Sequence, residues 1–123
     1  MGLFVDSGDD RGIGSSIHTV KLNNLSKSVD DDVMIALTQL SSHSLMHLEI
    51  SGCSKVGNRS MAALKIRCSL TLKYLDVSFV RKIYENIVVA LVKGCPLLTD
   101  LHIWGCSQIN VGNLSFFSGN INQ

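Results

Sequence analysis

The chain has 123 residues, 46% of them hydrophobic and 17% charged, which is enough apolar material for one small domain with its own core. A net charge of +1 supplies no strong attraction to nucleic acid, anionic membranes or acidic substrates, so local surface chemistry must select any partner. No apolar run approaches the roughly 20 residues of a membrane-spanning helix, and four cysteines are few for a disulfide-stapled secreted fold, so we expect a soluble cytoplasmic or nuclear protein without a membrane segment.

Residues 1–16 do not follow the pattern of the rest of the chain. They hold four of the ten glycines beside Asp6, Asp9 and Asp10. A segment rich in glycine and aspartate, without apolar periodicity, predicts a flexible leader ahead of the first repeating element.

From residue 17 onward, an apolar pattern close to Leu-x-x-Leu-x-Leu recurs four times. The copies begin at Ile17, Leu45, Leu72 and Leu98, at offsets of 28, 27 and 26 residues. Each copy ends in the alternation of side chains that is typical of a short strand. The sequence therefore predicts one short strand within each copy.

A second apolar pattern, with the three-to-four residue rhythm of a helix, follows each predicted strand. Its four copies are Met34-x-x-Leu37, Met61-x-x-Leu64, Val88-x-x-Leu91 and Leu114-x-x-Phe117. Helix starts are indicated at Asp30 or Asp31, at Asn58 and at Glu85, and Gly94 indicates a stop.

Strand, loop and helix thus recur together every 26–28 residues. One such unit cannot bury its apolar face alone, but stacked copies share a continuous core. The sequence predicts an α/β leucine-rich-repeat solenoid of about four repeats over residues 17–117, starting near residues 17, 45, 72 and 98. Short parallel strands would line its concave face and helices its convex face. The polar residues 118–123 are expected to fray.

The four cysteines lie on the period. Cys53 and Cys106 close the strand pattern, and Cys68 and Cys95 close the helix pattern, so we expect buried thiols that act as weak donors to loop backbone. The alternative of zinc ligands lacks a Cys-x-x-Cys pair, and the tightest grouping, Cys95 with His102 and Cys106, mixes a helix end with a strand. No cysteine stands out as an activated nucleophile. We expect no metal, no cofactor and no enzymatic activity.

The strand pattern also predicts which side chains point outward on the concave face. They form three columns: Thr19, His47, Tyr74 and Asp100; Lys21, Glu49, Asp76 and His102; Asn23, Ser51, Ser78 and Trp104. Tyrosine and tryptophan often carry the binding energy of an interface. We predict that a protein partner binds through His47, Glu49, Tyr74, Asp76, His102 and Trp104. The alternative for Trp104 is a cover over apolar surface at the end of the solenoid.

Basic residues in the loops after the predicted strands would line one rim. They are Lys27, Lys55, Arg81 and Lys82. A basic rim can contact phosphates, but these charges lack the interleaved aromatic residues of a nucleic-acid surface. We expect a solvated rim and no nucleic-acid partner.

Two motifs resemble a known family. The segment Cys95-Pro96-Leu97-Leu98-x-x-Leu101-x-Ile103-x-Gly105-Cys106-x-x-Ile109 is similar to the cysteine-containing leucine-rich repeats that are typical of F-box leucine-rich-repeat proteins. Trp104-Gly105-Cys106-Ser107-Gln108 and Asp76-Val77-Ser78 resemble the terminal repeats of leucine-rich-repeat proteins of nucleotide-excision repair that serve as ubiquitin-ligase components. The resemblance implies substrate recognition for ubiquitin transfer, with a ubiquitylation target or a ligase subunit as partner. The alternatives are a DNA-repair component and a structural or truncated repeat protein without activity of its own.

The sequence departs from the family pattern at several points. Residues 1–16 are too short for the helical F-box and lack amphipathic periodicity. Gly57-Asn58, Tyr84-Glu85 and Asn110-Val111 replace the usual Thr-Asp, so we expect less regular helix starts, and Val80 replaces a cysteine. Neither end offers a capping unit, which predicts a fragment or shortened relative with open ends that favour self-association.

Overall fold

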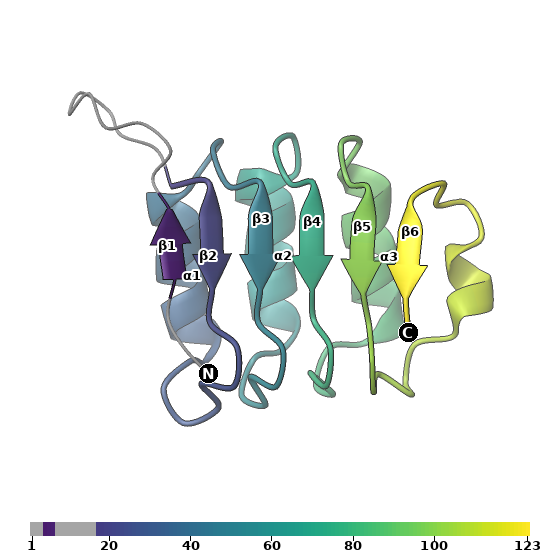
Figure 1. The fold of residues 1–123 in the computed structure, drawn as a ribbon, viewed down its shortest axis with the longest axis horizontal. Helices are drawn as coiled ribbons and strands as arrows, with labels where there is room; N and C mark the ends of the chain where they lie inside the picture. The colour runs from purple at the N-terminus through teal and green to yellow at the C-terminus, as the bar shows by residue number, and fades with distance from the viewer. Residues whose placement is uncertain (1–3, 7–16) are drawn as a thin grey trace.

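The computed structural model describes residues 4–6 and 17–123. Figure 1 shows one sheet whose strands follow each other in chain order, with the helices packed behind a single face. The strands are β1 Phe4–Asp6, β2 Thr19–Lys21, β3 His47–Glu49, β4 Tyr74–Asp76, β5 Asp100–His102 and β6 Asn120–Asn122. The strands from β2 to β6 are parallel, and β1 is antiparallel to β2.

A helix follows each of the strands β2 to β5. The helices are α1 Asp31–Leu40, α2 Asn58–Cys68, α3 Glu85–Gly94 and the 3-10 helix η1 Val111–Leu114. Helix α2 packs between α1 and α3. The alternation of parallel strands with helices on one face confirms the α/β, leucine-rich-repeat-like architecture that the period predicts. Within the described part of the chain, no helix is both long and apolar enough to cross a membrane.

The register of the sheet is the one that the period requires. Val20, Leu48, Leu75 and Leu101, the middle residues of successive strands, pair with one another and are at most 1% exposed. Because each strand presents alternate side chains to opposite faces, these residues enter the core under the helices while their neighbours point away from it. The predicted alignment of the first two outward columns is therefore confirmed.

The helix starts are joined from one unit to the next by side chains. The carboxylate of Asp31 accepts hydrogen bonds from the backbone N–H groups of Gly57, at 2.9 Å, and Ser60, at 3.2 Å, at the start of α2. Asn58 Oδ1 accepts from the N–H of Tyr84 at 2.9 Å in the same way. Neither Gly57 nor Tyr84 caps its own helix through a side chain, as expected where the family's Thr-Asp is missing. The preceding unit supplies the missing acceptors.

The two ends of the sheet differ from the sequence prediction. Phe4–Asp6, inside the segment predicted to be a flexible leader, form β1 and pair with the edge of β2, while residues 1–3 and 7–16 of that leader lie outside the described residues. Asn120–Asn122, predicted to fray, form β6 beside β5. The N–H of Ile103 donates to the carbonyl of Asn122 at 2.8 Å.

These corrections have one physical cause. An edge strand presents unpaired N–H and C=O groups, and a short segment of almost any composition can pair with them. Strands β1 and β6 pair with the edges of β2 and β5, whereas the capping unit that the sequence was expected to lack would cover the apolar ends of the core.

All four cysteines are buried and free. The Sγ of Cys53 donates to the carbonyl of Leu22 at 3.0 Å, and that of Cys106 donates to the carbonyl of Val77 at 3.2 Å. Burial raises the pKa of each thiol, to about 11 for Cys95. The predicted burial of the cysteines is confirmed, and three of them, Cys53, Cys68 and Cys106, bond to backbone carbonyls as expected.

Candidate functional site

One face of the sheet is turned away from the helices (Figure 1). We call it the open face and define it by the outward residues of β2 to β5, which are Thr19, Lys21, His47, Glu49, Tyr74, Asp76, Asp100 and His102. Their side chains are partly exposed. Five of the six predicted binding residues lie on this face, and Trp104 lies just beyond it in the loop after β5.

Three rings form a row across β3, β4 and β5. His47 and Tyr74 are stacked, with ring centroids 4.0 Å apart and planes 5° from parallel. His102 lies on the other side of Tyr74, at 4.7 Å and a tilt of 36°. The stack follows from the register, because His47 and Tyr74 are paired and neighbouring strands lie about 4.8 Å apart, close to the preferred spacing of rings. His102 is offset along β5, which accounts for the tilt.

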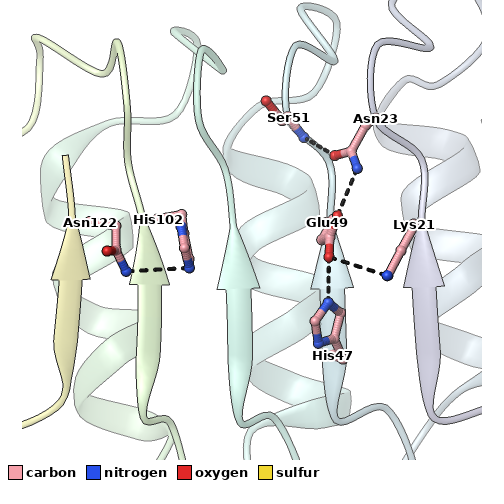
Figure 2. Close-up of polar contacts among 7 residues, drawn as sticks. All are labelled: Lys21, Asn23, His47, Glu49, Ser51, His102 and Asn122. Atoms are coloured by element: carbon pink, nitrogen blue, oxygen red, sulfur yellow. Dashed lines mark hydrogen bonds and ion pairs between the residues drawn. The ribbon is translucent and has the colours of Figure 1, made fainter. Parts of the chain in front are cut away.

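Glu49 is the centre of a polar network beside this row (Figure 2). Its Oε2 lies 2.6 Å from His47 Nε2 and 3.8 Å from Lys21 Nζ, and its Oε1 accepts a hydrogen bond from Asn23 Nδ2 at 2.7 Å. Partial burial alone would raise the pKa of Glu49, but the bonds to His47 and Asn23 and the charge of Lys21 together hold it below its usual value. Glu49 is thus charged at neutral pH and holds the imidazole of His47 in place.

Three carboxylates lie around Tyr74. Burial, followed by the carboxylates of Glu49, Asp76 and Asp100, raises the pKa of Tyr74, so its phenol stays protonated at neutral pH. These three carboxylates face one permanent cation, Lys21, among the described residues that define the open face. Lys21 lies on β2, next to Glu49 on β3. The excess negative charge of the open face therefore lies toward β4 and β5.

The last predicted column departs from expectation at Ser78. This residue was expected on the surface, but it is only 2% exposed, and its Oγ accepts a hydrogen bond from the N–H of Trp104 at 3.0 Å. The side chain of Trp104 is 50% exposed. Trp104 is therefore available for contact at the edge of the open face.

Phe79 is an exposed aromatic residue that the sequence analysis missed. It follows β4 in the loop beside Trp104, is 53% exposed, and donates its N–H to the Trp104 carbonyl at 2.6 Å. Its φ of +61° lies in the left-handed region, as do those of Gly52 and Gly105 at the equivalent positions of the neighbouring loops. The signal was present in the sequence, since the period places Phe79 where the adjacent copies have glycine.

Two other surface features lie outside the open face. The basic residues expected along one rim, Lys27, Lys55, Arg81 and Lys82, are all exposed. A shallow apolar groove of about 390 Å³ lies between α2 and α3, lined by Met61, Ala62, Lys65, Ile66, Ile87 and Ala90.

The suggested grouping of Cys95, His102 and Cys106 does not come together as a metal site. The two thiols are buried in the core, whereas His102 lies on the open face, where its Nε2 is 3.3 Å from Asn122 Nδ2 (Figure 2). Across residues 4–6 and 17–123, no group of three or more His, Cys, Asp or Glu side chains is suited to hold a metal ion.

Comparison with known proteins shows similarity at the level of fold. No family model and no curated protein matches the chain significantly. Eight chains of solved structures match it. One belongs to the crystal structure of the Rad7 and Elc1 complex in yeast, with a TM-score of 0.68 and 22% sequence identity. The match covers 83% of the present chain but only 27% of the other, and it supports the leucine-rich-repeat-like fold.

Proposed function

We propose that this chain is a protein-interaction repeat module whose open face binds a protein partner. The observation that carries the proposal is the row of His47, Tyr74 and His102, which stands on a sheet face that no described element covers. Rings that are already stacked lose little conformational freedom on binding, and aromatic residues are enriched among those that dominate interface energy. Glu49 fixes His47 before any partner arrives.

We further propose that the module binds and does not catalyse. A nucleophilic cysteine needs an accessible thiolate. The four thiols of this chain are buried, and burial raises their pKa. Unpaired thiols also agree with a reducing compartment such as the cytoplasm or the nucleus.

The finer proposal is recognition of substrates for ubiquitin transfer, with the chain holding a target or a ligase subunit. Its support is the resemblance to cysteine-containing repeats together with the similarity in fold to a chain from a protein–protein complex, that of Rad7 and Elc1. A role in DNA repair is the alternative drawn from the same similarity. We also propose four repeats, starting near residues 17, 45, 72 and 98, with β6 extending their sheet.

Quantitative affinity capture from cell extract tests the proposal. The baits are the wild-type chain, the double variant Tyr74→Ala, Trp104→Ala, and Ile66→Ala as a matched control in the groove between α2 and α3, where Ile66 is 76% exposed. We expect the wild type and the control to recover the same partners and the double variant to lose them. Recovery of the same partners by all three baits would refute binding through the open face. For the finer proposal, ubiquitin conjugates of a recovered partner should fall when the chain is depleted from cells.

A further inference from the structure

The backbone of Phe79 is strained, and its side chain is about half exposed. Left-handed φ values crowd the Cβ of every residue except glycine, so a phenylalanine there costs stability. The equivalent loops avoid this cost with Gly52 and Gly105, and Asn24, a residue type that tolerates this region, occupies the first copy. Burial of the ring offsets only part of the cost, because the side chain of Phe79 is 53% exposed.

The loops hold Phe79 in a defined place beside Trp104. A Cβ added to Gly105 would lie 2.3 Å from Cδ1 of Phe79, so the ring rests directly against the backbone of that glycine. The Phe79 N–H bond to the Trp104 carbonyl ties the two loops together. Phe79 and Trp104 thus form two exposed aromatic side chains on adjoining loops, which we call the aromatic rim.

The charge distribution indicates which occupant suits the rim. Below it, on the open face, lie the carboxylates of Asp76 and Asp100 next to Tyr74. Arg81 and Lys82, which follow Phe79 in the chain, are exposed. The part of the open face next to Tyr74 therefore offers negative charge to a bound segment.

We propose that the aromatic rim and the open face together bind an extended peptide segment that carries a lysine or arginine and, within a few residues of it, an apolar side chain. The basic side chain lies against Asp76, Asp100 and Tyr74, and the apolar side chain packs on Phe79 and Trp104. This inference rests on the proposed function and specifies the chemistry of the partner. Phe79 is then kept, despite its strain, for contact with the partner.

The test uses a display library of short random-sequence peptides as the probe and the full chain as bait. Wild-type chain should enrich peptides that carry both a basic residue and a nearby apolar residue. Affinity of an enriched peptide, measured by fluorescence anisotropy, should fall at least about tenfold for Phe79→Asn. It should also fall for the double variant Asp76→Asn, Asp100→Asn, and added salt should weaken the wild-type complex. Ile66→Ala serves as the unaffected control.

The variants separate a contact role from a structural one. Phe79→Asn places at residue 79 the residue type that occupies the same loop position at Asn24, so it should fold with an undiminished melting temperature. An enriched peptide that binds Phe79→Asn as tightly as the wild type overturns the inference. Enrichment of acidic peptides, or of no peptides at all, also overturns the inference.

Two further outcomes identify which proposal fails. Peptides that are lost with Tyr74→Ala but bind normally to Phe79→Asn and to the carboxylate variant would leave the proposed function intact and refute the inference. Sedimentation experiments test a second copy of the chain as the occupant. Self-association of the wild type that Phe79→Asn abolishes would show that copies of the chain, and not a basic peptide, cover the rim.

Discussion

Replacing Asp31 with alanine should destabilise the protein far more than the same change at the adjacent Asp32. Asp31 accepts hydrogen bonds from the N–H groups of Gly57 and Ser60 and from the Ser60 hydroxyl. Gly57 and Ser60 are both buried. Each N–H left without a partner costs about 1–3 kcal/mol, and loss of a negative charge near the start of α2 costs about 0.3–1 kcal/mol more. Because such contributions are not additive, we expect a total loss of about 2–4 kcal/mol.

Asp32 is a matched control, since it belongs to the same first turn of α1. Its contact is an ion pair with Arg59 at 3.1 Å, and the two side chains are 79% and 65% exposed. Pairs this exposed contribute about 0–1 kcal/mol. Urea denaturation of Asp31→Ala and Asp32→Ala, followed by circular dichroism, measures the difference directly. Equal losses for the two variants would refute the proposed link between units.

The contribution of Asp31 also has a predicted pH dependence. Partial burial would raise its pKa, but the bonds from Ser60 and Gly57 outweigh burial and lower it below the ordinary 3.8. A carboxylate with a depressed pKa in the folded state stabilises the protein above its unfolded pKa and loses that effect as the pH falls through the folded value. Wild type and Asp31→Ala should therefore converge in stability at a pH well below 3.8. A difference in stability between the two proteins that stays constant down to that pH would exclude the carboxylate of Asp31 as its cause.

Three other predictions concern a loop residue, a buried thiol and the last strand. Phe79→Asn should change the free energy of unfolding in urea by less than about 1 kcal/mol, because relief of left-handed strain offsets the lost contact of a half-exposed ring; a loss above about 2 kcal/mol would mean that the ring is structural. Iodoacetamide should label Cys95 only at the rate of unfolding, since its thiol is buried and its pKa is raised to about 11; rapid labelling of native protein, read by mass spectrometry, would contradict this. Removal of residues 120–123 should speed hydrogen exchange at the Ile103 amide, which donates to the carbonyl of Asn122. Unchanged exchange would show that residues 120–123 are frayed, as their composition suggests, and do not pair with β5.

The sequence predicts the sheet register well because side-chain pattern and stacking have the same period. Once Leu48, Leu75 and Leu101 are assigned to the core, the outward positions of the open face follow without further information. Strands β1 and β6 could not be found in this way, because each has only three residues, lies off the 26–28-residue period and pairs with backbone groups at an open edge.

The sequence predicts the candidate site only in part, for a related reason. The register places His47 beside Tyr74, and from that pairing a ring contact could have been expected. The network of Glu49 depends on rotamers and on Asn23, which reaches Glu49 from beyond the end of β2. Ser78 was assigned to the surface by strand alternation, but the strand ends at Asp76, and the turn that follows redirects the chain.

Ser78 and Phe79 are neighbours in one loop but have different roles. Ser78 stabilises the fold, and Phe79 is placed for contact with a partner. The hydroxyl oxygen of Ser78 accepts a hydrogen bond from the N–H of Trp104 and so secures the loop after β5. Phe79 follows immediately with a strained backbone and an exposed ring, at a position where glycine would satisfy the fold at lower cost. Selection for stability alone would favour glycine there, as at Gly52 and Gly105. The strained backbone and the half-exposed ring of Phe79 therefore agree with the proposed contact between the aromatic rim and a partner, and the Phe79→Asn variant separates that contact from the packing of the ring on Gly105.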